Sequence, residues 1–161
     1  HDNTESLATV RRVPNEPGMA AKVFTLLAEA GVNVDMIVQA SASTGTADIS
    51  FTVPGSAAAK VREVLQEKQD ELGYQSFDID ANVGKVAVVG VGMKTHSGLA
   101  AKFFNALSDE GVNVLMISTS EIRIAALVPL EQLQDAVRAL HTAYGLDAEQ
   151  VEAVVYGGTG R

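Results

Sequence analysis

Two kinds of hydrophobic pattern alternate along the chain. Apolar residues recur at three- and four-residue spacing where helices are predicted and at alternate positions where strands are predicted. In the first half, strands are expected at 7–13, 32–40, 48–53 and 74–81, and helices at 19–30 and 56–72. In the second half, strands are expected at 86–91, 112–118, 122–128 and 151–156, and helices at 97–110 and 130–144. The pattern therefore predicts the order β-α-β-β-α-β twice.

This order predicts an α+β fold built from two similar domains. Four short strands interrupted by two helices favour an antiparallel sheet with both helices on one face, the ferredoxin-like arrangement. A sequence repeat supports the duplication: PGMAAKVFTLLAEAGVNVDMI at 17–37 returns as SGLAAKFFNALSDEGVNVLMI at 97–117, with 12 of 21 positions identical. A period of this length is typical of small domains in tandem. We expect the domains to be 1–82 and 83–161.

Composition limits the partners. The 161 residues carry a formal net charge of −8, which argues against nucleic acid and anionic membranes because both attract basic surfaces. The chain has no cysteine, which excludes disulfides and thiolate metal sites. No apolar run reaches the roughly 18–20 residues of a membrane span. Each domain alone would bury only about 60% of its unfolded surface, so we expect it to pack against another domain or subunit. The start at His1 rather than Met indicates a fragment or a trimmed chain.

Motifs for catalysis or cofactor binding are weak. The sequence GVG at 90–92 follows a predicted strand, but the next glycine, Gly98, comes six residues after the motif instead of three, which disfavours a dinucleotide-binding turn. His96 and Ser97 are adjacent at a turn, where neighbouring side chains rarely face each other as a base and a nucleophile do. The histidines also lack ligand-spaced companions for a metal ion. Catalysis is therefore disfavoured, although a small ferredoxin-like enzyme stays open as an alternative.

The turn before the first helix of each half offers a place for a small anion. In PGMA at 17–20 and SGLA at 97–100, small residues leave the first helical N–H groups open. A helix N-terminus with free donors attracts a carboxylate. An equally weighted alternative is that these turns, and the GVN sequence after each helix, only terminate the helices and reverse the chain.

Polar side chains near this turn complete a site that suits an α-amino acid. Asn15 precedes the helix, and Asn33, Asp35 and Gln39 follow it on the next strand. The amides would donate and accept hydrogen bonds, and the Asp35 carboxylate would meet an ammonium group. In the second copy, leucine replaces the aspartate and threonine replaces the glutamine. A composite site built from both copies is therefore as plausible as two identical sites.

The residues also resemble those of a known family. Three stretches carry the resemblance: VGKVAVVGVGMKTHSGLAAKFFNALSDEGVNVLMISTSEIRIAALV at 83–128, NEPGMAAKVFTLLAEAGVNVDMIVQ at 15–39, and the closing AVVYGGTGR. They are similar to the regulatory region of bacterial aspartokinase, and more closely to the small β subunit of the heterotetrameric enzymes, which is a pair of ACT domains. The similarity runs over essentially the whole chain, and MISTSEIRI after a GMK turn is quite specific.

The resemblance implies a regulatory role without catalysis in this chain. Full-length members of the family phosphorylate aspartate with ATP through an N-terminal kinase domain that has no counterpart here. Their ACT pair senses threonine, alone or with lysine, and inhibits the kinase, which limits biosynthesis of the aspartate-derived amino acids. The resemblance further implies a cytoplasmic location, no cofactor, and the aspartokinase catalytic subunit or domain as a partner. It also implies a homodimer in which the first ACT domain of one chain pairs with the second ACT domain of the other.

Carried over by position, the resemblance implies an effector site between two chains. One chain would contribute Asn15, Pro17, Gly18, Met19, Ala20, Asn33, Asp35 and Gln39. The other would contribute Asn113, Val114, Ile117, Ser118 and Thr119. The chain departs from the family in three ways: aspartate usually stands where this chain has Asn15, loop 41–46 is shorter than in many relatives, and the second domain is expected to lack an edge strand. Two regulatory alternatives stay open, a free-standing ACT sensor of another small metabolite and a structural dimerisation module that binds nothing.

Overall fold

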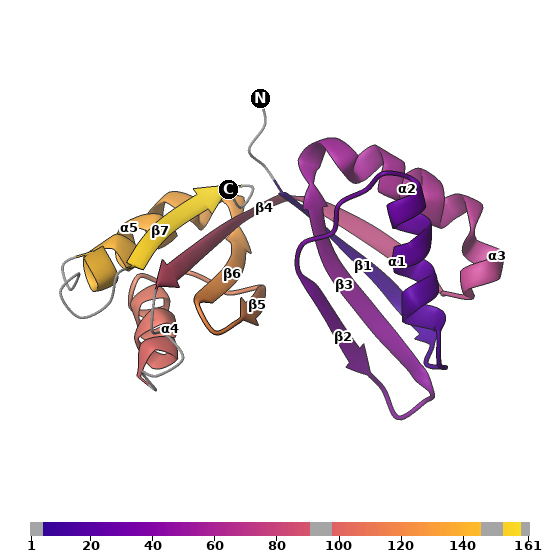
Figure 1. The fold of residues 1–161 in the computed structure, drawn as a ribbon, viewed down its shortest axis with the longest axis horizontal. Coiled ribbons are helices and arrows are strands. Elements are labelled where there is room, and N and C mark those ends of the chain that lie inside the picture. Colours follow the sequence, from indigo (N-terminus) through magenta and orange to yellow (C-terminus); the bar gives the residue numbers. More distant parts are fainter. Residues whose placement is uncertain (1–4, 91–97, 146–152, 159–161) are drawn as a thin grey trace. The chain divides into compact units, whose positions relative to one another are not determined.

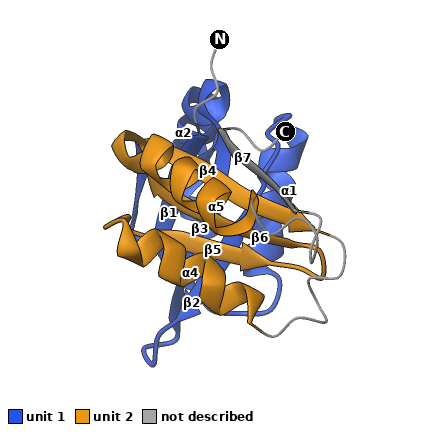
Figure 2. Cartoon of the chain, turned by 90° about the vertical axis from the view of Figure 1, so that its left-hand side faces the viewer, with its two compact units in different colours: residues 1–81 blue, residues 82–161 orange. Residues whose placement is uncertain are grey.

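The computed structural model describes residues 5–90, 98–145 and 153–158. The chain divides into two compact units, residues 1–81 and residues 82–161 (Figure 2). Strand β4 (Ser76–Gly90) is continuous across the division, so its first part belongs to the first unit and its second part to the second unit. The predicted GMK turn and the adjacent His96 and Ser97 lie outside the described residues.

The first unit is a mixed helix and sheet structure with the predicted element order. Its elements are β1 (Glu5–Pro14), α1 (Met19–Glu29), β2 (Ile37–Ser41), β3 (Thr46–Pro54), a 3-10 turn (Gly55–Ala57), α2 (Ala58–Glu67), α3 (Gln69–Leu72) and the first part of β4. The strand order is β2-β3-β1-β4, and β3 is antiparallel to both of its neighbours (Figure 1). Strand β2 is therefore an edge strand.

The second unit repeats this arrangement. After the second part of β4 come α4 (Leu99–Asp109), β5 (Met116–Thr119), β6 (Arg123–Pro129), a 3-10 turn (Leu130–Gln132), α5 (Leu133–Tyr144) and β7 (Ala153–Gly158). The strand order is β5-β6-β4-β7, and all three pairings are antiparallel. The common order confirms the predicted α+β fold of two ferredoxin-like units. The expectation that the second domain lacks an edge strand is wrong, because β5 and β7 form its two edges.

Several predicted elements differ in extent from those of the structure. The strands expected at 74–81 and 86–91 are one strand, β4, because no proline interrupts it and Gly84 keeps its place in the ladder opposite Val128. The helix expected at 56–72 divides into the 3-10 turn, α2 and α3, with the break at Lys68 (φ −105°, ψ 18°). The strands expected from residues 32 and 112 begin only at Ile37 and Met116. Just before Ile37, the Met36 N–H donates to the Thr52 hydroxyl at 3.0 Å.

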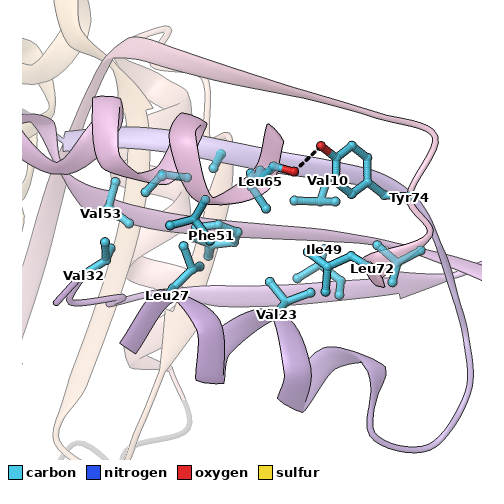
Figure 3. Close-up of a cluster of buried hydrophobic side chains, with 14 residues drawn as sticks. Val10, Val23, Leu27, Val32, Ile49, Phe51, Val53, Leu65, Leu72 and Tyr74 are labelled. Atoms are coloured by element: carbon cyan, nitrogen blue, oxygen red, sulfur yellow. Dashed lines mark hydrogen bonds between the residues drawn. The ribbon is translucent and has the colours of Figure 1, made fainter. Parts of the chain in front are cut away.

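The core of the first unit lies between the sheet and its helices. Val23 and Leu27 of α1 and Leu65 of α2 are fully buried against Ile49 and Phe51 of β3 (Figure 3). The apolar residues of both helices recur at helical spacing, so each helix turns a single stripe toward the sheet. Gly31 ends α1 in the left-handed conformation (φ 83°), as predicted for the position after a helix.

The second unit buries an equivalent core with different residues. Phe103 and Leu107 of α4 and Leu140 of α5 pack with Val88 of β4 and Ile124 of β6, and all are buried. In each unit a buried tyrosine hydroxyl donates to a helix carbonyl. Tyr74 donates to Leu65 O at 2.6 Å (Figure 3), and Tyr144 donates to Leu99 O at 2.6 Å.

Candidate functional site

A cavity of about 190 Å³ opens in the first unit where β1 ends and α1 begins. Its apolar wall includes Val13, Ala47 and Ile49 from the core face of the sheet. Its polar side chains are Asn15, Glu16 and Gln39. An apolar wall with a few convergent polar groups is the usual form of a small-molecule site. The volume lies below the roughly 300–1,000 Å³ of pockets that take drug-sized ligands, so it suits a small metabolite.

Asn15 joins the end of β1 to the hairpin formed by β2 and β3. Its backbone N–H donates to Gly45 O at 2.9 Å, and its side-chain Nδ2 donates to Ser41 Oγ at 3.3 Å. Its Oδ1 accepts a long hydrogen bond of 3.5 Å from Gln39 Nε2. The side-chain bonds are exposed and at the weak end of hydrogen-bond geometry. A ligand can therefore replace them at small cost.

The first turn of α1 lines another side of the cavity with backbone donors. Gly18 precedes the helix with φ 90°, and no side chain caps the helix there. The Met19 N–H donates to Glu16 O at 3.1 Å, which leaves the first-turn N–H groups of Ala20 and Ala21 without an intrahelical acceptor. Ala20 and Ala21 both line the cavity. The helix dipole adds partial positive charge at this end, so the site favours a carboxylate.

The register of the sheet explains why the side chain of Gln39 reaches this place. Gln39 lies opposite Ile49, and Ser41 lies opposite Ala47. Ile49 and Ala47 are buried, and Ile49 belongs to the core beneath the helices. Because directly opposite residues share a face, Gln39 and Ser41 also stand on the helix side of the sheet. Strand β2 is exposed along its whole length, which keeps both side chains accessible.

The structure brings some of the predicted site residues together and leaves others apart. Asn15, Gly18, Met19, Ala20 and Gln39 line the one cavity. Pro17 forms the turn immediately before Gly18.

Two further first-unit residues of the predicted site, Asn33 and Asp35, are exposed between α1 and β2 and are not part of the described cavity lining. The Asp35 N–H donates to Thr52 O at 3.0 Å, which fixes the backbone there in the sheet.

The predicted site residues of the second unit lie along and just before its own edge strand, β5. Asn113 is exposed, and its N–H donates to Gln132 Oε1 at 2.8 Å. Ile117 and Thr119 lie opposite Ala126 and Ile124 of β6, so they stand on the helix side of the sheet, as Gln39 does in the first unit. Val114 is exposed, and Ser118, on the other face, is half-buried.

The turn before α4 is only partly comparable with the turn before α1. Residues 91–97 lie outside the described part of the chain, so the predicted SGLA turn is seen only from Gly98 onward. Gly98 precedes α4 with φ −85°, whereas Gly18 precedes α1 with φ 90°. The entry into the two repeated helices therefore differs, although the sequences of the helices are similar.

Two polar residues of the site were missed by the sequence prediction. Ser41 bonds to Asn15, and the alternation of a strand could have identified it, since it lies two residues beyond Gln39 on the same face. Glu16 is the acidic residue in the cavity lining, where the sequence had suggested Asp35 for an ammonium group. Its side chain follows a turn rather than a regular strand or helix, so periodicity gave no signal for it.

Apolar side chains are exposed on and near the edge strand of each unit. On β2 these are Ile37, 52% exposed, and Val38, 39% exposed. In the second unit they are Leu115 and Ile117 on and before β5 and Ile122 in the hairpin that follows, between 45% and 55% exposed. Unpaired edges with exposed apolar residues are templates for pairing with another strand.

Other kinds of site find no support among the residues that the structure describes. No group of three or more His, Asp or Glu side chains there could hold a metal ion. None of the described helices is long and apolar enough to cross a membrane.

Comparison with known proteins shows to which protein family the chain belongs. The sequence model of the ACT domain matches residues 11–69 and, a second time, residues 86–144. The chain therefore belongs to the ACT-domain family, with one ACT domain in each half. Aspartokinase of Corynebacterium glutamicum is 46% identical over 99% of this chain. The chain spans 38% of the length of that relative.

Among solved structures, subunits of aspartokinase are similar to this chain over most of its length. The structure of aspartokinase α and β subunits matches with a TM-score of 0.83 and 43% identity, over 89% of this chain and 95% of the other. The ligand-free regulatory subunit of aspartate kinase from Thermus thermophilus matches with a TM-score of 0.82 and 36% identity, over the same shares of the two chains. The 161 residues correspond to the regulatory portion of aspartokinase.

Proposed function

We propose that this chain is the amino-acid sensor of a cytoplasmic aspartokinase and that it binds threonine, alone or together with lysine. The effector occupies the cavity at the start of α1 and transmits feedback inhibition to the catalytic subunit. The cavity itself is the observation that carries the proposal. It combines free backbone donors of a helix N-terminus with two side-chain amides and one carboxylate within about 190 Å³.

Each polar group of threonine has a matching group in the cavity. The carboxylate lies at the N–H groups of Ala20 and Ala21, where the helix dipole favours negative charge. The ammonium group faces the Glu16 carboxylate. The hydroxyl bonds to the amides of Asn15 and Gln39, which give up their long mutual hydrogen bond of 3.5 Å. An amide can donate and accept, so it serves a hydroxyl in either direction.

A second copy of the chain completes the site. Edge strand β2 of the first ACT domain pairs with β5 of the second ACT domain of the other chain, and the exposed Ile37 and Ile117 are covered at this contact. Both stand on the helix side of their sheets, opposite Phe51 and Ala126. The pairing brings Asn113, Ile117 and Thr119 of one chain toward the cavity of the other, and so joins two chains through one effector.

Regulation follows from the population of two arrangements of the dimer. A ligand that binds one arrangement more tightly shifts the equilibrium toward it, and a coupling of about 1–3 kcal/mol changes the affinity at the coupled site by roughly 5- to 150-fold. The partner that responds is the catalytic subunit, and the related structure that contains both α and β subunits supports this choice. A dissociation constant of about 10–1,000 µM, or roughly 4–7 kcal/mol, suits feedback by a metabolite.

Titration calorimetry with threonine, lysine and the other amino acids tests the proposal. Threonine is expected to release heat, and Gln39→Ala is expected to weaken its binding about 5- to 13-fold, since one hydrogen bond contributes about 1–1.5 kcal/mol. Gln66→Ala is the matched control, because Gln66 is an exposed residue of α2 away from the cavity lining. Heat with a different metabolite would favour a sensor of that metabolite. No heat with any amino acid would favour a structural dimerisation module.

A further inference from the structure

Strand β1 contains an irregularity immediately before the cavity. Val10 lies opposite Ile49, and Val13 lies opposite Ala47, so three steps on β1 correspond to two steps on β3. One extra residue is inserted between the two valines, which defines a β-bulge at Arg11 and Arg12. Val10 and Val13 both belong to the core beneath the helices, so both point to the same face of the sheet, whereas residues three apart in a regular strand point to opposite faces.

The extra residue decides which face of the sheet Asn15 occupies. Beyond the bulge, Pro14 lies opposite Thr46, and the Asn15 N–H donates to Gly45 O. Asn15, two residues after Val13, therefore lies on the same helix side of the sheet, where its side chain contacts Gln39 and Ser41. A shift of one residue moves every following side chain to the other face. Without the bulge, Asn15 would point away from the cavity.

Asp48 holds the bulge from the neighbouring strand. Its Oδ1 accepts the backbone N–H of Arg12 at 3.0 Å. Arg12 is the only non-glycine residue with a positive φ (59°) in the described part of the chain. Such a conformation is uncommon for a long side chain and persists only where its surroundings hold it.

On the other side of β1, the bulge is held by Gln75, just before β4, and by Asp78 within β4. The Gln75 N–H donates to Arg11 O at 2.9 Å, and the Arg11 guanidinium pairs with the Asp78 carboxylate.

Asp48 lies next to the cavity but is not part of its lining. It lies between Ala47 and Ile49 on β3, both of which line the cavity. Because successive side chains of a strand point to opposite faces, the Asp48 carboxylate stands on the face away from the cavity. Its effect on the cavity therefore passes through the backbone of β1.

The equivalent residues of the second unit, as far as the structure describes them, contain no β-bulge. Val88 lies opposite Ile124, as Val10 lies opposite Ile49, and the register of β4 with β6 is regular from Val83 to Val89. The residue equivalent to Arg12 is Gly90, two residues after Val88, and it is still part of strand β4. Before Ile124 stands Arg123, where the first unit has Asp48.

We propose that Asp48 is a positioning residue for the effector cavity: by holding the bulge at Arg12, it keeps Asn15 on the face where Gln39 and the start of α1 meet. The proposal rests on the proposed function, since threonine is the probe for the cavity. It predicts that the carboxylate is needed as a hydrogen-bond acceptor and not as a charge.

Four variants and the parent chain test this role by titration calorimetry with threonine. Asp48→Ala is expected to weaken binding at least about fivefold, the loss of one hydrogen bond. Asp48→Asn keeps an acceptor oxygen, so binding should stay within about twofold of the parent. Arg12→Gly should bind as the parent does, because glycine adopts positive φ without strain. Arg12→Gly combined with Asp48→Ala should recover most of the lost affinity.

Amide hydrogen exchange provides a readout that needs no ligand. The Arg12 and Asn15 N–H groups should exchange faster in Asp48→Ala than in the parent and at the parent rate in Asp48→Asn. Unchanged exchange in Asp48→Ala would overturn the positioning role, whether or not threonine binds. Faster exchange with unchanged threonine affinity would also overturn it. If the parent chain itself gives no heat with threonine, the proposed function fails, and the exchange rates still decide whether Asp48 holds the bulge. Should Asp48→Ala not fold, Asp48→Asn decides by exchange: a faster exchange of the Arg12 N–H in this variant, which keeps the acceptor oxygen, would overturn the positioning role, and an unchanged rate supports it.

Discussion

In the first unit the large aromatic residue of the core comes from the sheet, Phe51 on β3, and helix α1 contributes the smaller Val23. In the second unit the sheet contributes Ala126 at the equivalent position, and helix α4 contributes Phe103. All four side chains are fully buried. The two repeats therefore fill the same space between sheet and helix from opposite sides. A conserved fold requires the total volume to be kept, and it leaves open which element provides it.

The two units also differ in which element provides the larger side chain where the sheet meets the start of the second helix. Ser6 lies opposite Val53 in the first unit, and Gly84 lies opposite Val128 in the second. A Cβ atom on Gly84 would lie 2.8 Å from Leu133 Cδ2 on α5. The residue equivalent to Leu133 in the first unit is the small Ala58, which leaves room for the Ser6 side chain. The two units thus differ at this core contact by a compensating pair of residues.

Truncation of the two aromatic residues should have the largest effect on stability. Phe51→Ala and Phe103→Ala are each expected to lower the free energy of unfolding by about 3–5 kcal/mol, measured by urea denaturation. The double variant Phe103→Val with Ala126→Phe transfers the first unit's arrangement to the second. It should be more stable than Phe103→Val alone. A double variant that is no more stable would contradict the idea of an exchanged volume.

The buried tyrosines should make the stability of each unit fall at high pH. Burial raises the pKa of Tyr144 to about 12, and burial also raises the pKa of Tyr74. The pKa of Tyr144 in the folded state lies above its unfolded value near 10. The contribution of the protonated Tyr144 to the free energy of unfolding is therefore complete below pH 10 and disappears as the pH rises through about 12. The parent should therefore lose about 2–3 kcal/mol more than Tyr144→Phe over this interval. Denaturation curves from pH 9 to 12 measure the difference, and parallel curves would contradict it. Tyr74→Phe should change the slope in the same direction.

The smallest effects are expected at the positions of Ser6 and Gly84. Gly84→Ala should cost about 1–2 kcal/mol, because the new methyl group meets only the flexible end of Leu133. Adding Leu133→Ala should remove this overlap, so that Gly84→Ala costs less in that background than in the parent. In the first unit, Ser6→Ala should be neutral or stabilise by about 1 kcal/mol, since the buried Ser6 hydroxyl has no hydrogen-bond partner among the described residues. Thermal unfolding resolves both changes, and a destabilising Ser6→Ala would show that the hydroxyl is satisfied.

The fold could be predicted from the sequence because its signals are local and repeated. Helical spacing from Met19 to Ala30 and the return of that segment at 99–110 specify two equivalent units. The break at Lys68 could not be predicted, because no proline or glycine marks it. The extra residue at Arg12 left no signal either, since its conformation is imposed by Asp48 from another strand.

Part of the candidate site could also be predicted from the sequence. The residues next to the helix start, Asn15 and Gly18 to Ala20, follow from turn chemistry and the open N–H groups. Gln39 was predicted on the following strand, and the register with Ile49 places it on the cavity side. Ser41 and Glu16 depend on the hairpin register and the turn, and these are determined by tertiary packing. The proposed effector, threonine, cannot be predicted from the pattern of residues, and it rests on the family resemblance.

A crystal structure grown with threonine tests the central claim most directly, because it reports the ligand, its place and the pairing of chains together. The account predicts threonine in the cavity at the start of α1, with its carboxylate at Ala20 and Ala21 and its side chain between Asn15 and Gln39. It also predicts β5 of a second chain beside β2. Threonine bound elsewhere, or an empty cavity at saturating threonine, would contradict the account.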